Sequence, residues 1–367
     1  FNVLGAGDGF MAGLLRGWLD DRDWKEALRI ANACGALAVS RHGCTPAYPS
    51  RVELEHFLKH GPSRPDLRND PVLEQIHWST NRRRTWPDLC VFAFDHRAQF
   101  EDMAKAAGAD RREIGAFKLL CLEAATRVAQ GKEGFGILCD DRLGRAALHR
   151  AAESGLWIGR PVEKPGSRPL QLEIGDNFGP GLADWPIDHV VKVLCFCHPD
   201  DSAAVRSEQE STLLRLAAAA RFNSLDFLLE IIPSKVGAVD DSTAARLVQR
   251  FYDIGIFPDW WKLEPMTSQA AWTNVCDVIA RNDPHCRGIV VLGLGAREEA
   301  LAESFRCAAA QPLVKGFAVG RTIFAEAAQQ YLAGEIDDAA AVGMMAQRFA
   351  NLCDAWNQAR ASYLKAS

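Results

Sequence analysis

The sequence predicts a (β/α)8 TIM barrel of the α/β class, because eight short apolar runs alternate with helical segments. Apolar runs without polar alternation are typical of parallel strands that helices cover on both faces. Eight such units within residues 89–367 also suit a barrel of ~250 residues. An open doubly wound sheet is the competing fold, but the first run ends in Asp-His-Arg and not in a glycine-rich turn. The predicted strands are LCVFAFD (89–95), GFGILCDD (134–141), LWIGRPVE (156–163), HVVKVLCFC (189–197), LDFLLEII (225–232), PDWWKLEP (258–265), GIVVLGLG (288–295) and VKGFAVG (314–320).

The part of the chain before the barrel has a different pattern. Residues 1–60 are predicted to form a helix, a short strand, a turn and a further helix, with Ser50 and Glu53 placed as a capping box. Sixty residues of this kind bury too little surface for an independent domain. We therefore expect the end of a larger fold. Residues 61–88 hold four prolines and the basic triplet Arg82–Arg84, which predict a solvated linker rather than a binding patch.

Composition limits the possible function classes. The chain has 367 residues, enough for one large domain with an addition or for two domains. With 48% hydrophobic and 24% charged residues, it does not resemble disordered, collagen-like or coiled-coil proteins. A net charge of −5, from 42 basic and 47 acidic residues, gives no electrostatic reason to expect nucleic acid or an anionic membrane as partner. No apolar run approaches the ~18–20 residues of a membrane span.

The eleven cysteines are spread singly, mostly within apolar runs, where a thiol behaves as a small buried hydrophobe. A disulfide framework is not expected in a chain of this size, so we expect a reducing, cytoplasmic location. The one close pair, in Cys195-Phe196-Cys197-His198, has no second pair at zinc-finger spacing. No bound metal is therefore expected, although a metal site at this pair remains an alternative.

Charged residues interrupt the predicted strands near their carboxyl ends, where the chemistry of a barrel lies. Lys192 and Lys262 each stand inside an apolar strand, where an ammonium is costly unless it is paired or neutralised. One such lysine is equally well explained by a packed ion pair. Two of them, together with Glu230 inside a strand and Asp95 at a strand end, favour a catalytic site.

These residue types suit carbonyl chemistry. Burial among apolar side chains and a second nearby cation would lower the pKa of a lysine, and its free amine could then attack a ketone to form a Schiff base. The imine withdraws electrons, so a carbon–carbon bond one atom away can break while a carboxylate such as Glu230 moves protons. The loops after strands seven and eight, the usual phosphate site of a barrel, carry Gly293, Gly295, Gly320 and Arg321.

Several motifs occur in the order found in one enzyme family, across nearly all of residues 89–330. They are FAFDHR, EIGAFKLLCLE followed by GILCDDRLG, VEKPG, VVKVLCFCHPDD, DFLLEII, WWKLEP and GFAVGR. The segment resembles the class I (Schiff-base) aldolases related to tagatose 1,6-bisphosphate aldolase. Within that group it is most similar to the aldolase-like barrels fused behind a sugar kinase in bacterial proteins of myo-inositol catabolism.

The resemblance implies roles for individual residues. Lys262 would be the Schiff-base lysine, Glu230 the proton-transfer carboxylate, and Asp95 and Lys192 the groups that orient substrate oxygens. The implied substrate and phosphate contacts are Lys164, Gly293, Gly295, Gly320 and Arg321. The implied reaction needs no cofactor and cleaves a phosphorylated keto sugar acid, 2-deoxy-5-keto-gluconate 6-phosphate, to dihydroxyacetone phosphate and malonic semialdehyde. The chain departs from the family at Gly293, where a serine is usual, and at His96-Arg97-Ala98, where a glycine-containing turn is usual.

A second resemblance concerns the N-terminal run Gly5-Ala6-Gly7-Asp8-Gly9-Phe10. With the following AGLL and NACGALAV, it resembles the carboxyl-terminal signature of ribokinase-like sugar kinases, in which a glycine turn at a helix start surrounds the transferred phosphate. The resemblance implies Asp8 as the base and places Asn32 and Gly35 at the nucleotide pocket, with ATP and Mg²⁺ as cofactors of an intact kinase. Residues 1–60 are thus expected to be a truncated ribokinase-like α/β fragment that cannot phosphorylate a sugar by itself.

Three alternatives to a Schiff-base aldolase remain open at this point. A zinc-dependent lyase could use His96, His198 and the Asp140-Asp141 pair. A catalytically silent barrel could serve the kinase as a scaffold or sugar-phosphate sensor. Finally, the sugar kinase could be the main activity, with the barrel as its non-catalytic sugar-phosphate-binding module. A homo-oligomer is possible, although the C-terminal helical segment is expected to close the barrel rather than form a dimer surface.

Overall fold

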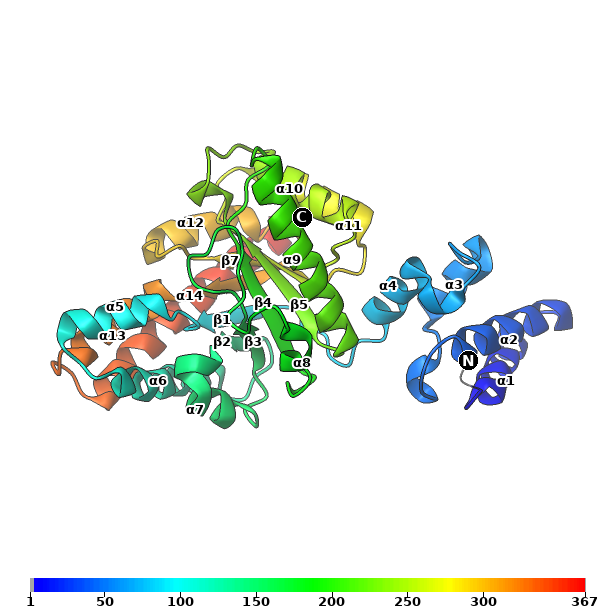
Figure 1. The fold of residues 1–367 in the computed structure, drawn as a ribbon, viewed down its shortest axis with the longest axis horizontal. Helices are drawn as coiled ribbons and strands as arrows, with labels where there is room; N and C mark the ends of the chain where they lie inside the picture. Colours follow the sequence, from blue (N-terminus) through cyan, green and yellow to red (C-terminus); the bar gives the residue numbers. More distant parts are fainter. Residues whose placement is uncertain (1–2, 367) are drawn as a thin grey trace. The chain divides into compact units, whose positions relative to one another are not determined.

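The computed structural model describes residues 3–366 and divides the chain into two compact units, with the boundary in the sequence between Thr85 and Trp86. The first unit is helical and the second is the barrel (Figure 1). Within the described residues, no helix combines the length and the apolar character needed to cross a membrane.

The helical unit differs from the sequence prediction in two ways. It contains no strand between residues 3 and 85, so the predicted short strand is wrong. The expected linker 61–88 contains a helix with the buried residue Leu73, because Asp70 caps the backbone N–H groups of the first turn and Pro71 occupies the first helical position. The elements of this unit are α1 (Ala6–Leu19), α2 (Trp24–Val39), η1 (Thr45–Ala47), α3 (Arg51–His60), η2 (Leu67–Asn69) and α4 (Pro71–Thr80).

A stripe of buried glycines lets α1 and α2 approach closely. A Cβ atom on Gly13 would lie 2.9 Å from the Cα of Ala31, and one on Gly17 would lie 2.7 Å from the Cα of Ala27. Both distances are below normal carbon–carbon contact, so a larger residue at either position would separate the helices. The glycines following the kinase-like turn therefore have a packing role.

The predicted capping box at α3 forms only by half. Ser50 accepts a hydrogen bond from the backbone N–H of Glu53 at 3.1 Å. The Glu53 carboxylate, which is fully buried, pairs instead with Arg41 and with His77 at 2.8 Å. The Glu53 side chain thus connects α3 to α4, because it forms buried ion pairs and does not accept a hydrogen bond at the start of its own helix.

The barrel unit confirms the predicted fold, and each predicted run contains one strand of a closed parallel barrel in the order β1 to β8. The open-sheet alternative is therefore wrong. The strands are β1 (Leu89–Ala93), β2 (Phe135–Leu138), β3 (Trp157–Pro161), β4 (His189–Cys195), β5 (Asp226–Ile231), β6 (Trp260–Leu263), β7 (Gly288–Leu292) and β8 (Val314–Val319). The helices are α5 (Ala98–Ala107), α6 (Arg111–Ala129), α7 (Asp141–Ala151), α8 (Phe178–Leu182), α9 (Ala203–Phe222), α10 (Thr243–Asp253), α11 (Gln269–Asn282), α12 (Glu298–Ala308), α13 (Arg321–Leu332) and α14 (Asp338–Ala366), and a short 3-10 helix, η3 (Pro233–Lys235), follows β5.

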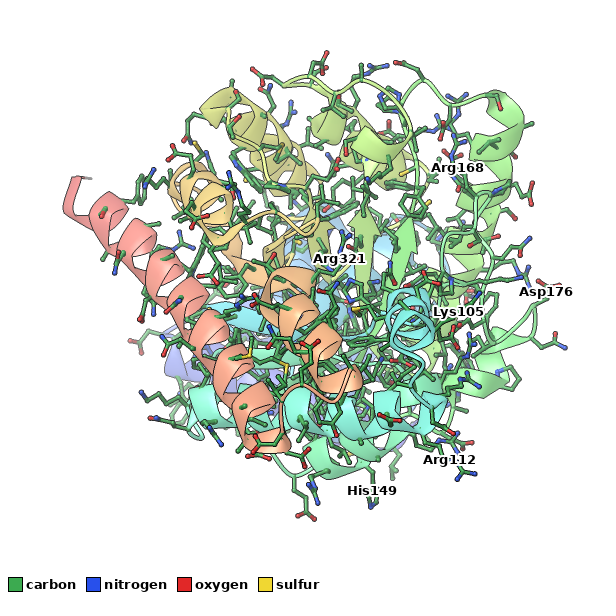
Figure 2. The ribbon with its side chains drawn as sticks, turned by 90° about the vertical axis from the view of Figure 1, so that its left-hand side faces the viewer. Lys105, Arg112, His149, Arg168, Asp176 and Arg321 are labelled. Carbon is green, nitrogen blue, oxygen red and sulfur yellow. The ribbon has the colours of Figure 1, made fainter. Side chains whose placement is uncertain are left out.

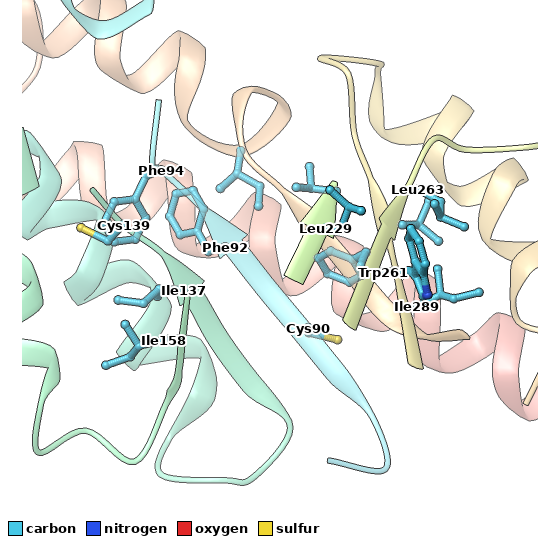
Figure 3. Packing of buried hydrophobic residues seen from close by; sticks show 14 of the residues in the cluster. Cys90, Phe92, Phe94, Ile137, Cys139, Ile158, Leu229, Trp261, Leu263 and Ile289 are labelled. Atoms are coloured by element: carbon cyan, nitrogen blue, oxygen red, sulfur yellow. The ribbon is translucent and has the colours of Figure 1, made fainter. Parts of the chain in front are cut away.

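Successive strand residues face opposite sides, which produces two separate cores. On β6, Trp261 and Leu263 pack between the strands and the surrounding helices, as Figure 3 shows. Trp260 faces the barrel axis. The residues of this inner core are Leu89, Val91, Ala93, Leu138, Trp157, Val190, Leu228, Trp260, Val290 and Ala318.

The C-terminal helix α14 lies against the barrel, as the sequence predicts. Its side chains Met345, Phe349 and Trp356 are buried, and the Phe349 ring lies 5.7 Å from that of Phe92 on β1. All eleven cysteines are free thiols, and nine of them are buried, in agreement with their expected role as small hydrophobes.

Candidate active site

Charged side chains occupy the interior layer directly above the inner core. The layer is built by strand geometry: Val190, Leu228 and Trp260 face the axis, and the residues two positions later on the same strands also face it. These are Lys192, Glu230 and Lys262, and Glu230 and Lys262 are direct partners in the β5–β6 register. Asp95, two residues after β1, joins them. The structure therefore brings together all four residues predicted to be catalytic.

Lys192 is the centre of the charge network. Its Nζ atom lies 3.1 Å from Asp95 Oδ2, 3.0 Å from Glu163 Oε1 and 2.9 Å from Glu230 Oε2. Burial acts to lower the pKa of Lys192, but the three carboxylates outweigh it and raise the pKa above its ordinary value. Burial therefore does not free the amine of Lys192, which the three carboxylates hold as a charged ammonium.

Lys262 has a different environment. It is 5% exposed, and its single ion-pair partner within the described residues is Glu230, whose Oε1 lies 3.1 Å from Nζ. Burial acts to raise the pKa of Glu230, but Lys192 and Lys262 together lower it below the ordinary value. Glu230 is therefore an ionised carboxylate with one oxygen on each lysine, within reach to accept a proton from Lys262.

His96 is a site residue that the sequence suggested only as an alternative metal ligand. It lines the same cavity, and burial lowers its pKa to about 4 despite the nearby Asp95 carboxylate. Its Nδ1 atom is buried and has no hydrogen-bond partner within the described part of the chain. At neutral pH this side chain is an uncharged imidazole that can donate or accept one further hydrogen bond.

Glu163 and Arg97 were not among the predicted site residues. Glu163 accepts from Arg97 at 3.1 Å and from the backbone N–H of Leu194 at 3.1 Å, in addition to its contact with Lys192. Arg97 also donates to the backbone oxygen of Glu163 at 2.8 Å. The sequence signal was available, because both residues stand at predicted strand ends.

The predicted phosphate residues line the other side of the same cavity, whose volume is about 280 Å³. Arg321 is the first residue of α13, and Gly320 is its N-cap (Figure 2). Gly295 has a φ of 76°, and a Cβ atom there would lie 3.1 Å from the Arg321 guanidinium carbon. Glycine at this position therefore both permits the left-handed turn and leaves room for the arginine. Gly293 completes this side.

Lys164 lies outside this cavity. Its side chain is exposed, its Nζ is 3.5 Å from Gln171 Oε1, and it lines a neighbouring hollow together with Arg142 and Arg160. Because adjacent residues in extended backbone point in opposite directions, the inward Glu163 places Lys164 on the outside. The acid of the VEKPG motif, and not its lysine, reaches the site.

The residues proposed for a zinc site are not brought together. His198 Nε2 lies 2.9 Å from the backbone oxygen of Ala238, and Asp140 pairs with the fully buried Lys118, which also donates to the His96 backbone oxygen at 2.9 Å. Asp141 pairs instead with Arg145. Among the described residues, no group of three or more His, Cys, Asp and Glu side chains is arranged to hold a metal ion.

In the helical unit, the predicted kinase residues gather at the start of α1. Gly5 is the N-cap with a φ of 78°, and Ala6, Gly7 and Asp8 form the first turn, in which Asp8 is exposed. Asn32 is exposed on α2.

Residues 53–360 match a family described as an uncharacterized protein conserved in bacteria (DUF2090). The chain belongs to this family. The DUF2090 match covers all eight strands of the barrel together with α4 and most of α3 and α14, while residues 1–51 match the pfkB family of carbohydrate kinases.

The curated relatives are kinases that match over a short stretch. A probable fructokinase-4 from Arabidopsis thaliana is 42% identical over 65 residues, which are 16% of this chain and 20% of that protein. An ATP-dependent ribose-1-phosphate kinase from Halopiger xanaduensis is 54% identical over 57 residues, or 16% and 19% of the two chains. A 2-dehydro-3-deoxygluconokinase from Bacillus subtilis is 42% identical over 57 residues, or 16% and 18%. The chain thus spans about a fifth of the length of these relatives.

Among solved structures, the fold is similar to fructose-bisphosphate aldolase from Plasmodium falciparum, with a TM-score of 0.57 and 15% identity. The similarity covers 80% of this chain and 96% of that chain. At this identity the comparison establishes an aldolase-like barrel fold, and the chemistry has to be argued from the site.

Proposed function

We propose that this DUF2090 barrel is a Schiff-base aldolase with Lys262 as its nucleophile. The observation that carries the proposal is the unequal pairing of two interior lysines. Lys192 is held by three carboxylates, whereas Lys262 shares one carboxylate, Glu230, with Lys192. Lys262 faces one carboxylate where Lys192 faces three, so we assign the attack on a carbonyl in the cavity to the amine of Lys262.

The proposed reaction begins when Glu230 accepts a proton from Lys262 and the free amine adds to the substrate ketone. Glu230 then returns the proton to the carbinolamine oxygen, water leaves, and the iminium forms. Asp95 and the Lys192 ammonium would orient the substrate hydroxyl and carbonyl oxygens. No cofactor is needed, because the lysine itself supplies the electron sink.

The proposed substrate is 2-deoxy-5-keto-gluconate 6-phosphate, as the motif resemblance implies, with its phosphate at Arg321. The imine forms at C5, and the C3–C4 bond breaks as the C3 hydroxyl gives its proton to Glu230, which is ionised again once the iminium has formed. The bonding electrons move to the iminium nitrogen and malonic semialdehyde leaves. Glu230 then gives the proton to C4 of the enamine, and water hydrolyses the imine to release dihydroxyacetone phosphate.

Trapping the imine tests this proposal. Incubation with dihydroxyacetone phosphate and sodium borohydride should leave a stable adduct on the peptide that contains Lys262. Lys262→Met should abolish the adduct, and so should Lys262→Arg, which keeps the charge but cannot form an imine. Lys105→Met, on the outer helix α5, is the matched control (Figure 2). No adduct in the wild-type protein, or one that persists in both Lys262 variants, would refute the Schiff base, and loss of cleavage on chelation would favour a metal lyase.

For the N-terminal unit we propose a role only within a complete sugar kinase, which would use ATP and Mg²⁺. The pfkB match and the turn before Asp8 support this role. Formation of ADP from ATP by residues 1–367 alone, with 2-deoxy-5-keto-gluconate as acceptor, would contradict it.

A further inference from the structure

The charges that line the active-site cavity do not balance. The basic side chains are Arg97, Lys192, Lys235, Lys262 and Arg321, and the acidic ones are Asp95, Glu163 and Glu230. All three carboxylates pair with Arg97, Lys192 or Lys262. Within residues 3–366, the side chains of the other two cations, Lys235 and Arg321, have no ion pair or hydrogen bond. The cavity therefore presents two unpaired positive charges to a ligand.

Lys235 is held at the cavity by the turn that precedes it. It ends η3, in which Pro233 is buried and the backbone N–H of Ser234 donates to Glu264 Oε2 at 3.0 Å. The Ser234 hydroxyl donates to the other oxygen of Glu264. Glu264 stands two residues after Lys262, so it fixes η3 to the end of β6. Both oxygens of Glu264 accept hydrogen bonds from Ser234, and within the described residues Glu264 forms no ion pair with Lys235.

The two unpaired cations follow well-separated strands and differ in chemistry. Lys235 follows β5 and Arg321 follows β8, three strands farther around a closed barrel of eight, with Lys262 on β6 between them. Arg321 begins a helix of 12 residues beside the Gly295 turn, which suits a phosphate. Lys235 is an exposed single ammonium without a regular helix start, so it offers one point charge, enough for a singly charged carboxylate.

We propose that Lys235 binds a carboxylate at the end of the substrate opposite the phosphate, and so selects phosphorylated keto acids over neutral ketose phosphates. This inference rests on the proposed function for the identity of the reaction, and adds Lys235 as the residue that selects the substrate. For the proposed substrate, Lys235 would contact the C1 carboxylate. After cleavage, that carboxylate belongs to malonic semialdehyde and not to dihydroxyacetone phosphate.

A binding experiment tests the subsite without requiring turnover. The probes are 6-phosphogluconate and glucitol 6-phosphate, which have the same chain length but differ at C1, a carboxylate against a hydroxymethyl group. Both carry a hydroxyl at C5, so neither can form an imine. By calorimetry, the wild-type protein and Lys105→Met should prefer 6-phosphogluconate by about tenfold. Lys235→Met should bind the two probes equally, and Lys235→Arg should keep the preference.

Three outcomes of this measurement overturn the subsite. The first is a preference for 6-phosphogluconate that persists in Lys235→Met. The second is a loss of affinity for both probes by the same factor in this variant, which indicates a structural role. The third is tighter binding of glucitol 1,6-bisphosphate than of 6-phosphogluconate that depends on Lys235, which would make this end a second phosphate site.

A condensation experiment separates this inference from the proposed function. Dihydroxyacetone phosphate is combined with malonic semialdehyde or with the neutral 3-hydroxypropanal, and Lys235→Met should raise the KM of malonic semialdehyde alone by about tenfold. An imine adduct with an unchanged acceptor preference in Lys235→Met rejects the carboxylate subsite and keeps the aldolase. No imine adduct, together with a probe preference that is lost in Lys235→Met, rejects the aldolase and keeps the carboxylate subsite.

Discussion

Two neighbouring layers fill the barrel interior, and the same strands build both of them. The lower layer contains Val190, Leu228 and Trp260, with the Trp260 ring 6.0 Å from that of Trp157 in an edge-to-face contact. The layer two residues farther along consists of Lys192, Glu230 and Lys262. Both layers are buried to a similar degree, so burial alone does not distinguish structure from function here.

The layers differ in what a single change would leave behind. Removing an apolar side chain leaves a void, whose cost does not depend on pH. Removing one charge from a closed network leaves buried partners without compensation, whose cost depends on their protonation. Stability measured against pH can therefore separate the two layers, and activity can separate the residues within the upper one.

The largest effect is expected for Lys192→Met. It removes the cation shared by three buried carboxylates, and at pH 7 should lower the free energy of unfolding by about 3–5 kcal/mol. In the wild-type protein the lysines lower the pKa values of Asp95 and Glu230, although burial acts to raise them. The two carboxylates therefore stabilise the folded protein at pH values above their unfolded-state pKa values, and this stabilisation is lost as pH falls. In the variant, burial dominates and raises the carboxyl pKa values, so the deficit should shrink from pH 7 to pH 4.5 in urea titrations. A deficit that is constant with pH would contradict the charge network.

Trp260→Ala should lower stability by a similar amount, but its effect comes from lost packing and should not depend on pH. Loss of a fully buried indole should lower the free energy of unfolding by about 3–4 kcal/mol, equally at pH 5 and pH 7. Phe222→Ala, at a ring that is 88% exposed, is the control and should change stability little. A Trp260→Ala deficit that follows pH as in Lys192→Met would mean that the two layers are not independent.

Glu230→Gln should separate catalysis from stability within the upper layer. The amide keeps the shape of the carboxylate, and Lys192 retains Asp95 and Glu163 as partners, but Lys262 loses its ion pair. The proton acceptor is lost, so kcat for cleavage should fall by about 100-fold, while the free energy of unfolding should fall by less than in Lys192→Met, because one lysine and not three carboxylates loses its partner. Glu123→Gln, at an exposed ion pair on α6, serves as control in the same assay. A near-normal kcat would assign the proton transfer to another group.

The smallest effect is expected for His96→Asn. The His96 pKa is lowered by burial from its usual 6.5 to about 4, so the wild-type protein loses stability as pH falls through this interval, because the unfolded imidazole binds the proton. The variant should lack this loss and gain about 1–2 kcal/mol relative to wild type between pH 7.5 and pH 5. His149→Asn, at an exposed position on α7, is the control (Figure 2). Equal pH slopes for wild type and His96→Asn would show that His96 is not desolvated.

The fold and the charged cluster of the candidate site could be predicted from the sequence for a common reason. An apolar strand tolerates an inward charge only at a site or in a closed ion pair, so VVKVL and WWKLE marked the right strands. The pattern did not reveal which carboxylates reach Lys192, because Glu163 comes from a strand end 29 residues earlier. Likewise, nothing in the sequence placed Lys235 at the cavity, since its position depends on the contact between Ser234 and Glu264.

The incorrect sequence predictions also concern contacts between residues that lie far apart in the chain. The prolines of residues 61–88 suggested a linker, but Asp70 and Pro71 start a helix that packs its Leu73. The VEKPG motif contains both Glu163 and Lys164, and the motif alone does not show which of the two side chains points into the barrel.

By itself, the sequence determined the eight strands, their parallel arrangement and the inward position of Lys262, since these follow from local periodicity and from the cost of burying charge. The tertiary structure decided which of the two lysines is surrounded by three carboxylates, which cavity cations form no ion pair within the described residues, and that Glu163 rather than Lys164 faces the cavity. Those properties depend on distances between residues from different strands, and electrostatic energies within a buried site change with each of those distances.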